Sequence, residues 1–185
     1  LLKVAAESQM MRVKWHPEAR QQFAGQRHQL GFAAGYLFAM AESGQYCPLC
    51  MTDGAARLVD RFGTEADRAK FLPGVATDGS EPMLTGAMFL TEKAGGSDVG
   101  ANLVQAEHIE ADQYRLYGEK WFCSNANADM IFVLARTDVE KPGTRGLSLF
   151  LVEREYEGQR NLLGMVRLKD KMGVRSMASA ECVLN

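Results

Sequence analysis

Apolar and polar positions change their spacing along this 185-residue chain near residue 80. Before that point, apolar side chains recur at intervals of three and four residues, the spacing of one buried helical face. After it, short runs rich in Val, Leu and Phe alternate with turn residues, which is typical of strands. The polar segment Thr77–Pro82 separates the two parts. The pattern predicts an α+β fold, with a helical part over residues 1–80 and a β part over residues 81–185.

The helical part begins with a segment over residues 17–22, because Pro17 suits the opening turn of a helix. A second helix ends at Gly44, and its expected buried face consists of Leu30, Ala33, Ala34, Leu37, Phe38 and Ala41. A third helix is predicted over residues 52–61, with Gly63 as its C-cap. Each helix is therefore delimited by glycine or proline.

A short last helix follows Thr64, which is the expected N-cap and forms a capping box with Asp67. We expect Pro73 and Gly74 to break this helix, since proline has no N–H to donate and clashes with the preceding turn.

The β part contains eight predicted strands: Met83–Thr91, Leu103–Ile109, Tyr114–Tyr117, Glu119–Ser124, Met130–Ala135, Leu147–Val152, Gly164–Leu168 and Ala180–Leu184. The turns between them are expected at Ala111–Gln113, at Gly118 and at Lys141–Gly143. Short strands at this spacing without intervening helices predict an antiparallel barrel or sandwich.

Composition and charge exclude several classes of function. There are 21 basic and 23 acidic residues, and no basic cluster is long enough to follow a nucleic-acid backbone. The longest apolar run, Gly31–Ala41, has about 11 residues, whereas a membrane-spanning helix needs roughly 20. Four cysteines are too few for a disulfide scaffold and suit a reducing compartment. We therefore expect neither nucleic acid nor membrane as a partner, and a cytoplasmic or mitochondrial-matrix location.

The first candidate for chemistry is the glycine-bearing turn that follows the strand predicted to end at Thr91. Its residues Gly95 and Gly96 allow backbone N–H groups to approach an anion, and Ser97 adds a hydroxyl donor. A phosphate or pyrophosphate would suit this turn. The segment matches neither the dinucleotide-binding nor the P-loop pattern, and an ordinary surface turn is the alternative.

The second candidate is the run Lys120–Asn125, which places aromatic side chains before two small polar ones. Strand alternation puts Phe122 and Ser124 on the same face. An aromatic face with a nearby hydroxyl suits a flat ring with polar edges, such as isoalloxazine. A core aromatic in a barrel is the alternative.

Four stretches in order make the chain resemble the acyl-CoA dehydrogenase family: MFLTEKAGGSD from Met88, GEKWFCSNANAD from Gly118, IFVLART from Ile131 and KDKMGVRSMAS from Lys169. The resemblance covers about residues 30 to 185. The TEKAGGSD form, Phe122 in place of the usual tryptophan, and YCPLCMT from Tyr46 resemble the AidB-like subgroup.

The resemblance implies an incomplete N-terminal helical domain over residues 1–80 and a middle β-domain over residues 81–185 that binds FAD and acyl-CoA. It implies that Met88, Leu90 and Thr91 lie along the flavin ring. It further implies that Gly96 and Ser97 hold the pyrophosphate, with Ser97 also reaching substrate. Phe122 would pack on the flavin face turned away from substrate, and Ser124 would donate to the N5 and O4 region.

The activity implied is dehydrogenation of acyl-CoA thioesters at the α and β carbons, with hydride passing to flavin N5. The family's base is a glutamate of a C-terminal helical domain, which we expect to be missing, so no catalytic residue is assigned here. Glu92 and Asp98 are interpreted as structural or loop-capping residues. An electron-transferring flavoprotein or another acceptor, and a homo-oligomer of two or four subunits, are the implied partners.

Two other functions remain open. One is an AidB-like flavoprotein that binds or protects under alkylation stress, with little dehydrogenase activity. The other is an α+β interaction domain without a cofactor. A chain that starts at Leu1 and stops at Asn185, directly after an apolar run, is expected to be a piece of a longer protein.

The remaining reactive residues carry weaker signals. The CPLC spacing of Cys47 and Cys50 is compatible with a dithiol pair or half a zinc site, but no second pair or histidine spacing completes one. We expect this segment to be a loop packed against the flavin-side cavity, and no metal site. The three histidines are isolated from one another and are interpreted as surface or structural residues.

Overall fold

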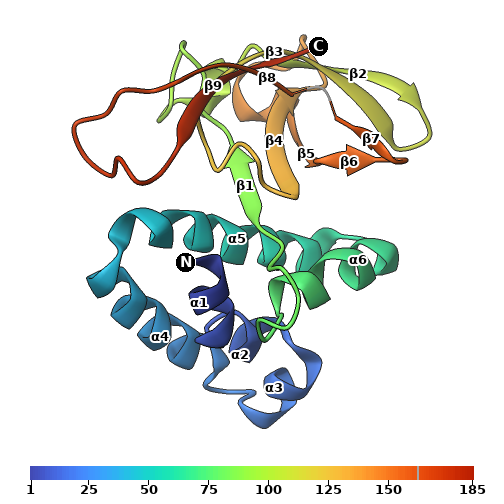
Figure 1. The fold of residues 1–185 in the computed structure, drawn as a ribbon. Coiled ribbons are helices and arrows are strands. Elements are labelled where there is room, and N and C mark those ends of the chain that lie inside the picture. The colour runs from blue at the N-terminus through green and yellow to red at the C-terminus, as the bar shows by residue number, and fades with distance from the viewer. Residues whose placement is uncertain (162) are drawn as a thin grey trace. The chain divides into compact units, whose positions relative to one another are not determined.

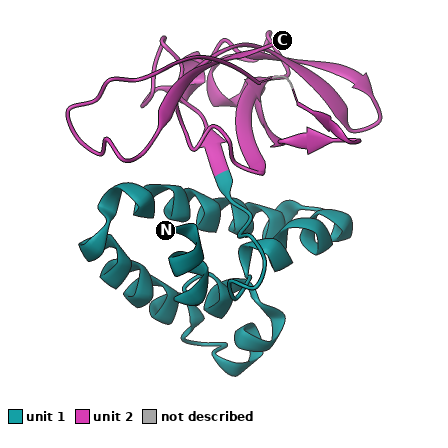
Figure 2. Cartoon of the chain, in the orientation of Figure 1, with its two compact units in different colours: residues 1–86 teal, residues 87–185 magenta. Residues whose placement is uncertain are grey.

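The computed structural model describes residues 1–161 and 163–185. The chain forms two compact units, a helical unit over Leu1–Gly86 and a β unit over Ala87–Asn185 (Figure 2). Short 3₁₀ turns at Val99–Ala101 and Gly143–Gly146 lie in connections between strands of the β unit. The predicted α+β class and the order of its parts are confirmed.

The helical unit consists of α1 (Leu2–Glu7), α2 (Arg12–Trp15), α3 (Pro17–Gln22), α4 (Arg27–Ala41), α5 (Ser43–Phe62) and α6 (Glu65–Val75) (Figure 1). Pro17 opens α3 as predicted. Gly63 is the C-cap of α5, and the Thr64–Asp67 capping box is complete at the start of α6. These local signals are confirmed because they depend only on neighbouring residues.

The junction between α4 and α5 differs from the prediction. The Glu42 carboxylate accepts hydrogen bonds from the backbone N–H groups of Gly44, at 2.8 Å, and Gln45, at 3.4 Å. Glu42 is therefore an N-cap, and α5 begins nine residues before the predicted start at Thr52. The prediction that Gly44 ends a helix is wrong, because Gly44 lies in the first turn of α5.

The prolines inside these helices also behave differently from the prediction. Pro48 lies inside α5, so the CPLC segment is helical and the predicted loop there is wrong. Pro73 lies inside α6, which continues through Gly74 to Val75 instead of breaking. Packing outweighs the hydrogen bond that each proline removes, since Pro48 is buried and Val75 is fully buried.

The buried face of α4 was predicted wrongly. Its buried residues are Gly31 and Gly35, while Leu30 and Leu37 of the predicted face are 40% and 67% exposed. A Cβ at Gly31 would collide with the side chain of Lys14, and one at Gly35 would collide with Tyr46. Neighbouring elements supply the large side chains, so α4 contributes the small ones to this interface.

Polar contacts fasten α2 to α5. Lys14 and Trp15 are both buried, and they donate to the two carboxylate oxygens of Asp53 at 2.8 Å each.

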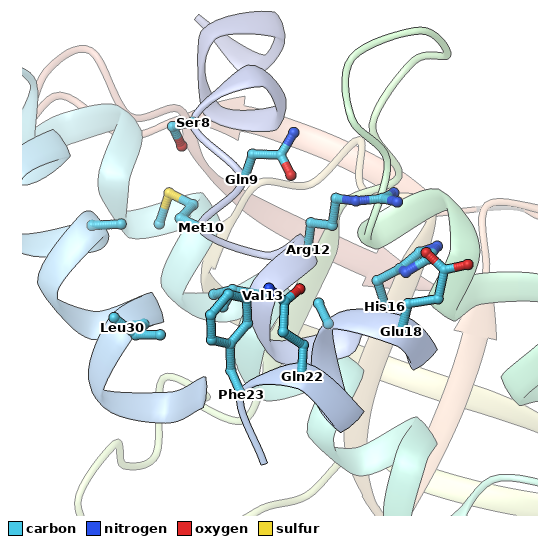
Figure 3. Close-up of a pocket in the computed structure, with 12 residues that line it drawn as sticks. Ser8, Gln9, Met10, Arg12, Val13, His16, Glu18, Gln22, Phe23 and Leu30 are labelled. Atoms are coloured by element: carbon cyan, nitrogen blue, oxygen red, sulfur yellow. The ribbon is translucent and has the colours of Figure 1, made fainter. Parts of the chain in front are cut away.

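The helical unit also contains a hollow of about 500 Å³. It is lined by apolar side chains such as Met10, Phe23 and Leu30 and by polar ones of α2 and α3 (Figure 3). None of the residues predicted to bind a cofactor lines this hollow.

The β unit contains β1 (Gly86–Phe89), β2 (Gln105–Glu110), β3 (Gln113–Ser124), β4 (Met130–Arg136), β5 (Leu147–Glu153), β6 (Glu155–Tyr156), β7 (Gln159–Arg160), β8 (Leu163–Leu168) and β9 (Ser179–Leu184) (Figure 1). The strand order of the main sheet is β1-β4-β2-β3-β9-β8, with β5 paired to β4. The pairs β2–β3, β3–β9, β4–β5 and β8–β9 are antiparallel as predicted, whereas Gln105 and Arg136 form one parallel pair.

The prediction that Gly118 separates two strands is wrong, because β3 runs through it. Tyr117 pairs with Gln105 on β2, and Gly118 pairs with Leu184 on β9, so the strand changes partner at this point. Gly118 has φ +131°, and a Cβ there would lie 2.9 Å from Val104 Cγ2. Glycine allows the strand to bend closely past Val104 while its pairing continues.

The core of the β unit lies between these strands. It contains Ala87, Phe89, Val104, Leu116, Cys123, Ala128, Ile131, Val133, Ala135, Ala180, Cys182 and Leu184. β4 and β9 are buried along nearly their whole length. This core holds the ends of β1, β3 and β9, which carry the candidate site.

Candidate functional site

The end of β3 contains a bulge that exposes an aromatic ring. Lys120 pairs with Cys182 and Cys123 with Ala180, so two residues of β3 stand opposite one residue of β9. Phe122, one of the two, has φ +58° and a side chain that is 53% exposed. In a regular strand without the extra residue, Phe122 would lie on the same face as buried Lys120 and would point into the core. The alternative of a core aromatic is therefore contradicted.

A cation lies over this aromatic pair. Lys169 Nζ is 3.1 Å from the centroid of the Trp121 ring and 4.3 Å from that of Phe122. The two rings stand edge to face, with centroids 6.2 Å apart. A hollow of about 400 Å³ opens beside them, lined also by Arg167, Lys171 and Glu181. Unlike the hollow in the helical unit, this one includes a predicted site residue.

Ser124 lies two residues beyond Phe122, and buried Cys123 separates the two. Ser124 is half-buried, so both side chains lie on the face of β3 that points away from the core, as predicted. Its Oγ is 2.7 Å from Ser179 Oγ on β9. Lys171 Nζ donates to Ser179 Oγ at 3.1 Å and to the Met177 carbonyl at 2.5 Å.

β1 and the residues after it bring further predicted residues to β3. Ala87 and Phe89 are buried in the core, so Met88 and Leu90 occupy the opposite, half-buried face. The strand itself is shorter than the predicted Met83–Thr91. The backbone N–H of Trp121 donates to the Thr91 backbone carbonyl at 2.9 Å, which places Thr91 beside the aromatic bulge.

The glycine-bearing turn is closed by two backbone hydrogen bonds between Glu92 and Gly95, at 3.1 and 3.2 Å. Gly96 approaches the Thr91 side chain so closely that a Cβ would lie 3.3 Å from Thr91 Cγ2. Ser97 follows and is exposed. The structure thus gathers Thr91, Gly96 and the strand of Phe122, and Ser97 lies one residue further along the turn.

A buried ion pair supports this turn from inside the β unit. Lys120 Nζ contacts Glu92 Oε1 at 2.7 Å, and the two side chains are 0% and 5% exposed. The Glu92 carboxylate also accepts from the N–H groups of Leu103, at 2.6 Å, and Val104, at 3.2 Å. These contacts agree with the interpretation of Glu92 as a structural residue. Burial lowers the pKa of Lys120 from its ordinary 10.5, while the hydrogen bond and the charge of Glu92 act in the opposite direction.

Two more side chains hold the backbone in and around the 3₁₀ turn Val99–Ala101. Buried Asn102 donates from Nδ2 to the Leu90 carbonyl at 2.7 Å. The Arg136 guanidinium donates to the carbonyls of Asn102, at 3.1 Å, and Gly100, at 2.8 Å. Residue spacing did not single out Lys120, Asn102 or Arg136. The available signal for Lys120 was a charged residue at an inward position of a strand.

The other candidate sites receive no support from the geometry. Among residues 1–161 and 163–185, no group of three His, Cys, Asp or Glu side chains is placed to hold a metal ion. None of the four cysteines, which lie in that part of the chain, forms a disulfide. In the same residues, none of the helices combines the length and the apolar character needed to cross a membrane.

Comparison with known proteins identifies the family. Residues 87–185 match the family model "Acyl-CoA dehydrogenase, middle domain". The chain is 33% identical over 194 aligned residues to acyl-CoA dehydrogenase family member 11 of Caenorhabditis elegans, covering 100% of this chain and 31% of that protein. It is 38% identical to the AidB protein of Escherichia coli (strain K12), covering 78% of this chain and 27% of that protein.

Solved structures agree with this result. The C. elegans protein in complex with C11-CoA superposes with a TM-score of 0.85 at 33% identity, over 99% of this chain and 32% of that one. Butyryl-CoA dehydrogenase of Megasphaera elsdenii gives a TM-score of 0.80 at 26% identity, over 100% of this chain and 46% of that one. The chain thus spans about a third of the length of these curated relatives. It belongs to the acyl-CoA dehydrogenase family, and residues 87–185 are its middle domain.

Proposed function

We propose that this chain is the flavin-binding part of a FAD-dependent acyl-CoA dehydrogenase. The observation that carries the proposal is the exposed Phe122 ring, held in a left-handed bulge beside the Ser124 hydroxyl. A left-handed backbone at a residue other than glycine costs of order 1–3 kcal/mol, and such strain concentrates at functional sites. A strand that buried Phe122 would avoid this cost, so the exposed ring indicates a ligand that packs on it.

The residues of the β unit fit a flavin in chemistry and in shape. Phe122 offers an apolar face, and Thr91, Ser97 and Ser124 offer hydroxyl donors of the kind that the ring edge and the pyrophosphate need. At Gly96, a Cβ would press on Thr91, so the missing side chain keeps the backbone of the turn accessible. A similar solved structure, an acyl-CoA dehydrogenase of Bacillus anthracis at 26% identity, is described as complexed with FAD.

In the proposed site, Met88, Leu90 and Thr91 lie along the flavin ring, with Phe122 packed on the face away from substrate. Ser124 donates to the N5 and O4 region. Gly96 and Ser97 hold the pyrophosphate, and Ser97 also contacts substrate. When bound, FAD supplies the acceptor for the hydride that leaves the β-carbon of the thioester.

The same proposal assigns a role to each part of the chain. Residues 1–80 belong to an N-terminal helical domain, and residues 81–185 bind FAD and acyl-CoA. The proton next to the thioester carbonyl is removed by a carboxylate outside this chain. A flavoprotein electron acceptor is supported by the similarity, at 26% identity, to a structure described as an electron transferring flavoprotein of Acidaminococcus fermentans. Assembly into dimers or tetramers and a cytoplasmic or mitochondrial-matrix location remain predictions.

The test uses the full-length protein, purified under native conditions and analysed for bound FAD. Phe122→Ala and Ser124→Ala are expected to weaken FAD retention, whereas Tyr156→Ala, which removes an exposed aromatic ring on β6 of the same unit, leaves it unchanged. Anaerobic addition of acyl-CoAs of several chain lengths is expected to bleach the flavin absorbance.

The outcomes separate the candidate functions. A flavoprotein that no acyl-CoA bleaches would favour the AidB-like protective role over dehydrogenation. A colourless full-length protein would contradict both flavin-dependent functions and favour an interaction domain.

A further inference from the structure

The hydroxyl of Ser124 belongs to a chain of polar groups that begins at a charged amine. Lys171 Nζ donates to Ser179 Oγ at 3.1 Å, and Ser179 Oγ is 2.7 Å from Ser124 Oγ. The Met177 carbonyl accepts from the same amine at 2.5 Å, which anchors it between buried Met177 and buried Ser179. The three side chains come from β3, β9 and the segment between β8 and β9.

The chemistry of these groups gives the chain a direction. An ammonium group only donates, so Ser179 Oγ is an acceptor toward Lys171. A hydroxyl that accepts from a charged donor becomes a stronger donor itself. Ser179 Oγ keeps one proton of its own to donate, and Ser124 Oγ is its neighbour at 2.7 Å, in a pair where either hydroxyl can be the donor. When Ser179 is the donor of this pair, Ser124 acts as acceptor, and its own proton is free to point to the face that it shares with Phe122.

We propose that Lys171 and Ser179 are positioning residues that turn the Ser124 proton outward, toward an acceptor atom at the edge of the bound flavin ring. The proposal rests on the flavin site proposed above. With the chain intact, Ser124 is preset as a donor. Without the ammonium or the Ser179 hydroxyl, the Ser124 proton is free to turn back toward β9.

The test is a double-mutant cycle in the full-length protein loaded with FAD, read out by the flavin midpoint potential and by the shape of its visible absorbance band. Lys171→Met and Ser179→Ala are each expected to shift both signals in the direction of Ser124→Ala and to weaken FAD binding by up to about fivefold, the equivalent of one hydrogen bond of ~1 kcal/mol. Combined with Ser124→Ala, neither substitution has a further effect. Lys171→Arg, which keeps a charged donor, restores the signals.

Two further results would be decisive. The proposal would be overturned if Lys171→Met and Ser179→Ala caused the same shifts in the wild-type background and in the Ser124→Ala background. Such shifts would come from a structural or purely electrostatic effect that does not need the Ser124 hydroxyl. The control is Ser148→Ala, which breaks a comparable hydroxyl pair with Thr137, at 3.0 Å, elsewhere on the same unit and leaves the flavin signals unchanged. If Ser124→Ala alone leaves FAD binding, potential and spectrum unaltered, the flavin assignment of Ser124 itself is wrong.

Discussion

Replacing Lys120 by methionine removes one partner of the buried ion pair beneath the glycine-bearing turn. Methionine keeps most of the aliphatic stem, so the main loss is the charge that faces Glu92 at 2.7 Å. The Glu92 carboxylate stays buried and keeps its hydrogen bonds from Leu103 and Val104. Breaking a buried pair in this way costs about 3–5 kcal/mol, and the remaining backbone donors place the expected loss near the lower limit, about 3 kcal/mol.

The loss is measured by urea unfolding of wild-type and Lys120→Met protein, followed by tryptophan fluorescence and circular dichroism. With a denaturant dependence of about 1–3 kcal/mol per molar urea, the midpoint is expected to fall by roughly 1–3 M. Lys93→Met is the matched control, since Lys93 contacts Glu119 at 2.6 Å but both side chains are more than half exposed. Its stability is expected to change by less than about 1 kcal/mol.

The double mutant Lys120→Met/Glu92→Gln tests the cause. Because glutamine leaves no uncompensated charge, the double mutant is expected to be more stable than Lys120→Met alone. A Lys120→Met protein as stable as the Lys93→Met protein would refute the reasoning that burial makes this pair important.

Two further predictions concern single residues of the two units. Burial and the hydrogen bond with Cys50 raise the pKa of Tyr46 to about 12, so its contribution to stability is complete below pH 10 and is lost as the pH rises from 10 to about 12. The ultraviolet absorbance of tyrosinate, compared between wild type and Tyr46→Phe, measures this pKa, and ionisation near pH 10 would contradict the prediction. Gly118→Ala forces a side chain into φ +131° and to within 2.9 Å of Val104, and is expected to lower the unfolding free energy by about 1–3 kcal/mol. Gly173→Ala, where nothing lies within 4 Å of the new Cβ, is the control, and equal losses from both substitutions would argue against a close passage at Gly118.

Much of the candidate site was predictable as a set of residues and much less as geometry. Thr91, Gly96, Phe122 and Ser124 were selected from sequence, and the structure gathers the first three around the bulge and the turn that follows β1. The supporting side chains were not selected, because their importance comes from partners far away in the chain. Lys120 pairs with a residue 28 positions away, and Ser179 contacts one 55 positions away.

Features that depend on a few neighbouring residues could be predicted from the sequence. Examples are the capping box at Thr64, the turn between β2 and β3, and the change from helical to strand spacing. Tertiary structure alone decided which side of α4 is buried, because Lys14 and Tyr46 from other elements fill the space above its glycines. It also decided that Phe122 faces outward, since the bulge exists only where β3 pairs with β9. The hydrophobic pattern shows which side chains could be buried. Strand register and packing between distant segments determine which of them are buried.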